Sequence, residues 1–319
     1  MSSRLHAHIG TVRQLEILLA VYEYGSVKAA SEALFLTQPT VSMQLKKLAE
    51  AIEMPLYDIV GRKIVFTEAG RLLVGTAREV LESFSRLDMS LDNLRGLKSG
   101  TLNLAVVTTS KYFIPHILGP FCEKYPDVDV QLNVGNRQQI IERLKEGRDD
   151  FYVFSHPPDD VDIDQIEFLV NPLVAIANEG HPLTAKKRLT LRDIEKENFI
   201  MRETGSGTRH AITEYMKKNN VELNIRMTIE SNEAIKHAVM SGLGVSILSA
   251  HTLSFGGSAG LTQLSVKDLP IRTNWYFVWL RSKRQSLIAT EFLDHVETEG
   301  RNMLIQELQR SGVKKRDIV

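Results

Sequence analysis

Apolar residues in the first sixty positions recur at the spacing of α-helices. Residues 11–24 place apolar side chains on one face, and Thr11 can cap the helix start. That face consists of Val12, Leu15, Leu18, Leu19 and Tyr22. Gly25 ends this helix, and Ser26 can cap a second helix over residues 26–34, whose small alanines allow another helix to cross closely.

A third helix over residues 37–52 has two different faces. Thr37 can cap it, and Pro39 fits its first turn. Its apolar stripe consists of Val41, Leu45 and Leu48. Its opposite face consists of Gln38, Thr40, Ser42, Met43, Gln44, Lys46 and Lys47. Hydroxyls and amides near a helix N-terminus suit base edges in the major groove, and lysines suit phosphates. The pattern predicts a DNA-reading helix; the alternative is the solvated face of a three-helix bundle.

Residues 55–66 predict a β-hairpin that turns around Gly61, Arg62 and Lys63. Basic residues at such a tip form a wing that can reach phosphates or a minor groove. A solvated surface turn is the alternative. With the three helices, the hairpin completes a predicted domain over residues 1–66.

Residues 67–98 predict a long helix with a seven-residue apolar repeat. The repeat consists of Leu73, Ala77, Val80, Phe84, Leu87, Leu91 and Leu94. It is typical of a coiled coil, so we expect this linker helix to dimerise the chain; packing on its own domain is the alternative. A dimer would carry two DNA-reading heads, which predicts an operator with partial dyad symmetry. Gly96 and residues 98–100 end the helix and form a hinge.

Strands and helices alternate after Gly100, which predicts an α/β domain with parallel sheets over residues 99–299. The predicted strands lie at 101–109, 128–134, 149–155, 173–177, 198–203, 225–231, 244–249 and 274–280. A helix from Ser110 is expected to break at Pro115 and Pro120. We expect two lobes, one of residues 99–169 and 271–299 and one of residues 170–270. Residues 300–319 are expected to be a helical or disordered tail.

Polar residues stand where several of these strands end and helices begin. Ligands of open α/β sheets lie at the carboxyl ends of strands, and helix N-termini attract anions. The candidates are Thr108, Thr109, Ser110, Asn136, Arg137, Gln138, His156, Arg202, Gly205, Ser206, Gly207, Thr208, Arg209, Asn232 and Glu233. They predict a cleft for a small anionic metabolite; ordinary caps and turns are the alternative, with a rigid hinge as the alternative for His156.

Composition narrows the functional classes. The 319 residues carry 39 basic and 39 acidic side chains, so the formal net charge is zero. A zero net charge argues against a DNA-compacting protein. No apolar run suits a membrane helix, and the N-terminus does not resemble a signal peptide, which speaks against a secreted solute-binding protein. Cys122 is the only cysteine, so no intrachain disulfide forms, and we expect a cytoplasmic protein. The histidines lack metal-ligand spacing, and no nucleophile has an assignable base, so neither a metal, a cofactor nor an enzyme is predicted.

The segments TQPTVS (37–42) and TEAG (67–70) stand in the order described above, at the start of the third helix and directly after the hairpin. In this order they resemble the winged helix-turn-helix of LysR-type transcriptional regulators. The resemblance covers residues 11–298 and implies a fold of α plus α/β class with a periplasmic-binding-protein-like sensor. It implies DNA contacts by the residues Ser26, Thr37, Gln38, Pro39, Thr40, Ser42 and Met43 and by Arg62 on the wing. It also implies a dimer of dimers that contacts RNA polymerase.

The sensor segments ETGSGTRHAITEYM (203–216) and SNEAIKHAVMSGLGVSILS (231–249) resemble the CbbR/CmpR branch of that family. Regulators of this branch control carbon-fixation and carbon-uptake genes and sense phosphorylated sugars, two-carbon phosphates, 2-oxo acids or nicotinamide cofactors. The chain departs from the branch at Phe151, Tyr152 and Phe154, where relatives carry small residues. These three side chains are expected to reshape the floor of the cleft.

Overall fold

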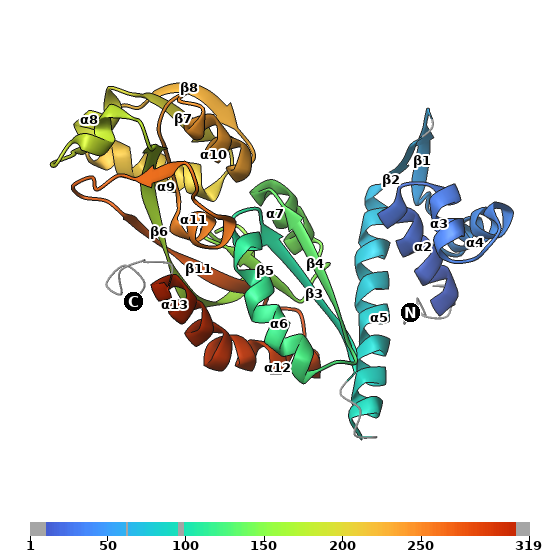
Figure 1. Ribbon diagram of the computed structural model, residues 1–319. Helices are drawn as coiled ribbons and strands as arrows, with labels where there is room; N and C mark the ends of the chain where they lie inside the picture. The colour runs from blue at the N-terminus through green and yellow to red at the C-terminus, as the bar shows by residue number, and fades with distance from the viewer. Residues whose placement is uncertain (1–10, 62, 95–98, 311–319) are drawn as a thin grey trace. The chain divides into compact units, whose positions relative to one another are not determined.

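The computed structural model describes residues 11–61, 63–94 and 99–310 (Figure 1). The chain divides into two compact units, residues 1–96 and 97–319. The long helix that the sequence assigned to a separate linker therefore belongs to the first unit. The predicted hinge at Gly96 and Lys98 lies outside the described residues, as does Arg62.

The first unit consists of helices α2 (Val12–Tyr24), α3 (Val27–Ala33) and α4 (Gln38–Ile52), strands β1 (Tyr57–Val60) and β2 (Lys63–Phe66), and helix α5 (Glu68–Leu94). The expected caps are present: the side chains of Thr11, Ser26 and Thr37 accept backbone N–H groups at the starts of α2, α3 and α4. β1 and β2 pair antiparallel, as a hairpin requires.

The core of the first unit lies between α2, α4 and the start of α5. Val41, Leu45 and Leu48 are fully buried there, which confirms the predicted stripe. Gly70 lies where α5 passes the hairpin, and a Cβ at this position would be 1.9 Å from the Leu56 carbonyl oxygen. No larger residue fits, because that contact is with backbone, and this explains the glycine of the TEAG segment.

The apolar repeat of α5 divides into two parts. Leu73 and Ala77 are buried in the core of their own unit, and Val80 packs against that core. The remaining members are exposed: Phe84, Leu87, Leu91 and Leu94. The first part of the repeat thus follows the alternative interpretation, while the second part leaves an apolar stripe on the helix surface.

The first lobe of the second unit is built on three parallel strands, β3 (Gly100–Val107), β4 (Val128–Gly135) and β5 (Phe151–Phe154). Its helices are α6 (Ile114–Lys124), α7 (Arg137–Lys145), α12 (Leu287–His295) and α13 (Arg301–Arg310), with a 3₁₀ turn, η1, at Ser110–Tyr112. A π-helical turn at Val296–Gly300 joins α12 to α13.

The second lobe contains η2 (Pro182–Ala185), α8 (Leu191–Glu195), β7 (Asn198–Arg202), α9 (Gly207–Lys218), β8 (Asn224–Ile229), α10 (Asn232–Met240), β9 (Ser246–Ser249), α11 (Ala250–Gly256) and β10 (Leu261–Gln263). β7 and β8 pair parallel, and β9 and β10 pair antiparallel with the long strand β6 (Ile163–Asn178).

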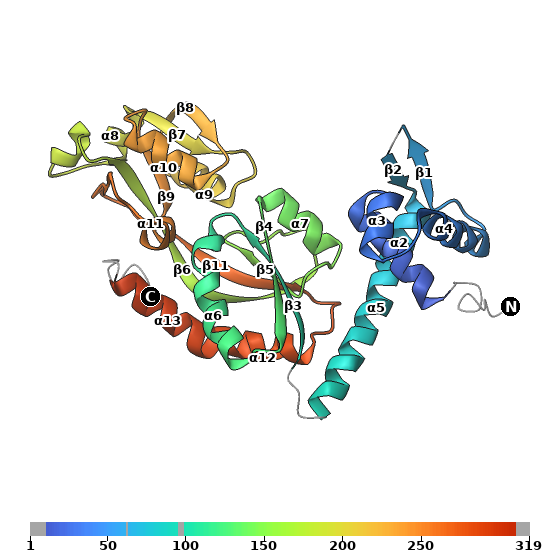
Figure 2. The same ribbon diagram turned by 45° about the vertical axis from the view of Figure 1, so that its right-hand side comes forward.

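Two long strands, β6 and β11 (Ile271–Leu280), run through both lobes (Figure 2). They pair antiparallel along their length, and β11 also pairs antiparallel with β5. The seven-stranded sheet is therefore mixed, whereas the alternation of strands and helices had predicted parallel sheets. β6 and β11 carry the chain between the lobes: Leu169 and Trp275 lie in the core of the first lobe, and Leu173 and Ile271 lie in the core of the second.

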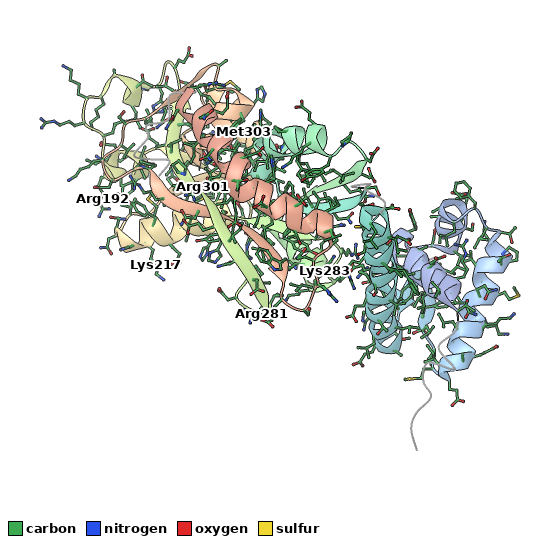
Figure 3. All side chains as sticks on the ribbon, turned by 90° about the horizontal axis from the view of Figure 1, so that it is seen from below. Arg192, Lys217, Arg281, Lys283, Arg301 and Met303 are labelled. Carbon is green, nitrogen blue, oxygen red and sulfur yellow. The ribbon has the colours of Figure 1, made fainter. Side chains whose placement is uncertain are left out.

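Two helices of the first lobe bear on specific sequence expectations. The helix expected from Ser110 is interrupted before Pro115, as predicted, because Ser110–Tyr112 is a separate 3₁₀ turn and α6 begins at Ile114; Pro120, however, lies inside α6 and does not break it. Residues 301–310 of the predicted tail form the helix α13, in line with the helical alternative, and Leu304 and Leu308 bury it in the core of the first lobe. The exposed Arg301 and Met303 lie on the outer side of this helix (Figure 3).

Candidate functional site

The first candidate site is the N-terminal half of α4. The exposed members of the predicted polar face are Gln38, Ser42, Met43, Lys46 and Lys47, and Pro39, a contact implied by the family resemblance, is also exposed. The hydroxyls of Thr37 and Thr40 lie 2.8 Å apart and bond each other beside the helix cap. Gln44 is half-buried and accepts a hydrogen bond from the Gln14 amide at 3.0 Å, so it belongs to the support of the helix.

Two more predicted residues flank this helix. Ser26 is half-buried, and its hydroxyl accepts the Ala29 N–H at 3.1 Å, so its visible role is to cap α3. Lys63 is exposed at the start of β2, in the wing hairpin.

Phe35 is a residue of this surface that the sequence analysis missed. Its φ angle is 55°, in the left-handed region, and its side chain is 96% exposed. The Phe35 N–H bonds the Glu32 carbonyl and the Leu36 N–H bonds the Ser31 carbonyl, which together make a Schellman motif. Glycine usually occupies the left-handed position of that motif. A large exposed aromatic ring at that position, two residues before Thr37, is therefore unusual.

The second candidate site is a narrow cleft between the two lobes of the second unit. The first lobe contributes Val107, Thr108, Thr109, Arg137, Phe154, Ser155 and His156. The second lobe contributes Arg202, Glu203, Ser206, Gly207 and Thr208. Eight of the predicted effector residues thus meet in one cleft.

Arg202 connects the two lobes across this cleft. Its guanidinium is 3% exposed and donates to the hydroxyls of Thr108 and Thr109 in the first lobe, at 3.1 and 3.3 Å. In the second lobe it donates to the Asn232 amide oxygen at 2.6 Å and forms a two-bond fork with Glu203. A buried charge needs such partners, because an unpaired one carries a large desolvation cost.

The bonds of Arg202 leave the threonine hydroxyl hydrogens available. A hydroxyl that accepts from Arg202 still has one O–H to donate. The Thr109 oxygen accepts from Arg202 and also from the Asn232 amide, at 3.1 Å. Among the described residues, neither the Thr108 nor the Thr109 hydroxyl donates to a protein acceptor. The two O–H groups can therefore donate to an anion in the cleft.

Arg137 is the second cation of the cleft. Its Nε donates to the His156 carbonyl at 3.1 Å, which is its one hydrogen bond among the described residues. Both Nη nitrogens are thus open to a ligand. Burial lowers the pKa of Arg137, which indicates a partly desolvated charge. Such a cation attracts an anion more strongly than one in bulk water.

His156 and His210 stack across the lobes with ring centroids 4.4 Å apart. Burial, followed by the charges of His210 and Arg137, holds the pKa of His156 below its usual value. The His156 side chain forms part of the cleft lining. His156 lies in the connection between β5 and β6, so it is not part of the strands that cross between the lobes.

The remaining predicted residues lie outside the cleft lining. Asn232 and Arg209 support Arg202, the latter by donating to the Arg202 carbonyl at 2.8 Å. Asn136 caps α7, and Gln138 bonds Glu142 on its own helix. Other members take structural roles: Ser110 bonds the Val107 carbonyl, Gly205 forms a left-handed turn, and Glu233 accepts from Tyr112.

Three details of the cleft were not predicted correctly. Ser155 and Glu203 line it but were not singled out; each was the last residue of a predicted strand, and each directly follows a strand in the structure, β5 and β7. A Cβ at Gly207 would lie 2.8 Å from the Ser155 hydroxyl, so this glycine allows the lobes to approach. Of the three large residues in the third strand, Phe154 lines the cleft, while Phe151 and Tyr152 are buried in the core.

Comparison with known families decides the identity of the two units. Residues 12–71 match the family described as bacterial regulatory helix-turn-helix protein, lysR family. Residues 95–301 match the LysR substrate binding domain. The chain belongs to the LysR family of bacterial transcriptional regulators. The fold, the regulatory function and the family predicted from the sequence are thereby confirmed.

Within the LysR family the chain is similar to the CmpR and CbbR regulators, as the sequence predicted. It is 45% identical to the HTH-type transcriptional activator CmpR of Synechocystis sp., over 90% of this chain and 94% of that protein. It is 36% identical to the regulator CbbR of Rhodospirillum rubrum, over 91% of this chain and 97% of that protein. These relatives are named as regulators, not as enzymes.

Solved LysR structures agree with the fold. The Synechocystis CcmR regulatory domain, solved in complex with 2-PG, is 44% identical with a TM-score of 0.61, and the match covers 64% of this chain and 99% of that one. Full-length CbnR, complexed with its target DNA, has a TM-score of 0.66 at 22% identity, over 90% of this chain and 99% of that one. Across the described residues, no helix is long and apolar enough to span a membrane. Nor does the described part of the LysR chain gather three metal-ligating side chains.

Proposed function

We propose that the cleft between the lobes binds a small metabolite with two anionic groups, of the phosphorylated carboxylate class. The observation that carries this proposal is the open guanidinium of Arg137 beside two threonine hydroxyls with free hydrogens. The N-terminus of α9, at Gly207 and Thr208, adds N–H groups to the same wall. The bound 2-PG of the similar CcmR domain belongs to that class and supports the proposal.

The DNA contacts follow from the exposed face of α4. We infer that Gln38, Ser42 and Met43 meet base edges in the major groove, while Lys46 and Lys63 meet phosphates. Phe35 extends this face, because its exposed ring precedes the helix that reads DNA.

The exposed stripe of α5 supports a dimer that reads a partial dyad. Phe84, Leu87, Leu91 and Leu94 are apolar side chains that a partner helix would cover. In this proposal two dimers form a tetramer, and effector binding alters the lobe arrangement and thereby promoter contact by RNA polymerase. The effector can shift that equilibrium only by binding one arrangement more tightly than the other. We place the protein in the cytoplasm and propose genes of carbon metabolism as targets, by similarity to CmpR and CbbR.

Isothermal titration of the full-length protein with 2-phosphoglycolate tests the effector class. The variant Arg137→Gln should bind at least about tenfold more weakly, because one charge-assisted contact is lost. Arg188→Gln removes the same charge from an exposed position of the second lobe and should bind like the wild type. Both variants should still bind operator DNA in a gel-shift assay. If phosphorylated carboxylates as a class fail to bind the wild type, the effector proposal is wrong.

A further inference from the structure

Arg202 lines the cleft, yet all five of its N–H donors are already used within the protein. Nε and Nη2 donate to the Glu203 carboxylate at 2.7 and 2.8 Å. Nη1 donates to Asn232 and Thr109, and the second Nη2 hydrogen goes to Thr108. A guanidinium has five N–H donors, so none remains for a ligand. An anion can reach this cation only if a present partner leaves.

Glu203 is the partner that an anion can replace. Its carboxylate is the same kind of group as the effector's own, and it binds Arg202 through the two-bond fork that suits a carboxylate or phosphate. The Glu203 side chain lines the cleft and is 13% exposed, so it has a route toward solvent. Asn232, by contrast, is buried and also bonds Thr109, so it has a structural role in holding Arg202.

We propose that Glu203 is an internal competitor of the effector: it holds the fork of Arg202 until an anionic group of the ligand takes its place. This inference rests on the proposed anion-binding function of the cleft. It adds a second cationic contact to Arg137, one from each lobe. A ligand with two anionic groups can then bind Arg137 with one and Arg202 with the other.

The exchange explains how the cleft can discriminate among anions. Replacing Glu203 by a ligand carboxylate forms as many bonds to Arg202 as it breaks, so this step alone yields little net binding energy. A net gain requires the second anionic group at Arg137. A single carboxylate such as acetate should therefore bind poorly, while a phosphorylated carboxylate binds well.

Isothermal titration of the full-length protein with 2-phosphoglycolate, inorganic phosphate and acetate tests whether Glu203 competes with the effector for Arg202. Glu203→Gln weakens the fork and should raise affinity for 2-phosphoglycolate about tenfold. Glu203→Asp keeps the charge but shortens the side chain, so its affinity should rise by a smaller factor, about threefold. Glu214→Gln removes an exposed charge from α9 of the same lobe and should leave affinity unchanged.

The outcomes separate this inference from the proposed function. If the wild type binds 2-phosphoglycolate and Glu203→Gln binds no tighter, the competitor is refuted while the effector site stands. If Glu203→Gln binds tighter but Glu203→Asp matches the wild type, Glu203 acts by charge repulsion alone, and the exchange is refuted. If neither protein binds any phosphorylated probe, both proposals fail.

Melting temperatures provide a second readout, since Glu203→Gln leaves the buried Arg202 charge with a weaker partner. The variant should melt at a lower temperature than the wild type without ligand. Saturating 2-phosphoglycolate should restore most of the difference, because the ligand supplies the missing anion. A loss that 2-phosphoglycolate does not restore would show that Glu203 has only a structural role.

Discussion

Phe35 has a left-handed backbone conformation that glycine or asparagine would adopt at a lower energetic cost. A non-glycine residue in the left-handed region is strained by about 1–2 kcal/mol, and asparagine tolerates the region best among the other residues. Phe35→Asn should therefore stabilise the first unit by about 0.5–1 kcal/mol and weaken operator binding. Urea unfolding and gel-shift titration measure the two effects. Phe35→Ala, which keeps the strain but removes the ring, should weaken binding without the gain in stability; unchanged binding in both variants would contradict a role in DNA contact.

His251 is fully buried, and its pKa is lowered to about 4, chiefly by that burial. Its Nε2 lies 2.9 Å from the Val170 carbonyl, so the neutral ring donates there. The unfolded chain protonates this histidine from about pH 6.5 downward, whereas the folded chain resists protonation until about pH 4. The contribution of His251 to folding stability is therefore fully present above pH 6.5. The free energy of unfolding should fall by about 3 kcal/mol as the pH drops to 4.

The measurement for His251 is urea unfolding of the second unit at several pH values. His251→Gln should be less stable at pH 7 but should lose less stability between pH 6.5 and 4 than the wild type. Equal pH slopes in the two proteins would exclude His251 as the source.

Single residues were predictable from sequence where local chemistry decides their role. Thr11, Ser26 and Thr37 cap their helices as expected, because a cap depends on the next three residues. Glu203 could not be recognised, because its fork with Arg202 depends on Thr108 and Asn232, which come from distant parts of the sequence. Phe35 was missed because its φ angle is a property of the fold and not of a residue pattern.

At the scale of elements, the apolar repeat of α5 leads to two predictions, one for its buried part and one for its exposed part. Leu73→Ala removes a buried side chain and should destabilise the first unit by about 2–4 kcal/mol without changing the state of association. Leu87 is 53% exposed, so Leu87→Asp should dissociate the dimer with less effect on the fold. Sedimentation and urea unfolding measure the two quantities. A Leu87→Asp protein that remains dimeric would contradict the assignment of the exposed stripe.

The C-terminal helix α13 contributes to the core of the first lobe. Leu304→Ala should destabilise the second unit by about 2–5 kcal/mol, because the side chain is almost fully buried. The control change Gln309→Ala truncates an exposed side chain of the same helix and should cost no more than about 0.5 kcal/mol. Thermal unfolding compares them directly. If the two substitutions cost the same, α13 does not pack as the structure shows.

Elements were predictable where one pattern dominated. Most strands of the second unit lie close to their predicted positions, because buried strands are apolar. The predicted strand at 173–177 is only the end of β6, which begins at Ile163, and β10 was not predicted. The direction of β6 and β11 was not predictable, since an apolar strand looks the same in parallel and antiparallel pairing. The packing of α13 depends on contacts with distant residues, which no local pattern contains.

At the scale of the whole molecule, the sequence separated a DNA-reading part from a sensor part, and the two compact units agree with that division. The alternation of strands and helices predicted two lobes, and the family resemblance added the periplasmic-binding-protein-like sensor fold. The cleft itself was anticipated from the positions of polar residues after strands, which is a general property of α/β sheets. Which residue binds which could only come from the folded chain.

The pairing of β6 with β11 has a consequence for protein engineering. Leu173 and Ile271 are partners in that pairing, so the chain enters the second lobe and returns from it at neighbouring points, about 5 Å apart. In sequence terms, the second lobe is an insertion between two segments of the first lobe. Exchanging residues 174–270 for those of a related regulator would need two adjacent junctions and would carry Arg202 and Glu203 with the graft while Arg137 stays behind. Such a chimera would show which half of the cleft chooses the effector.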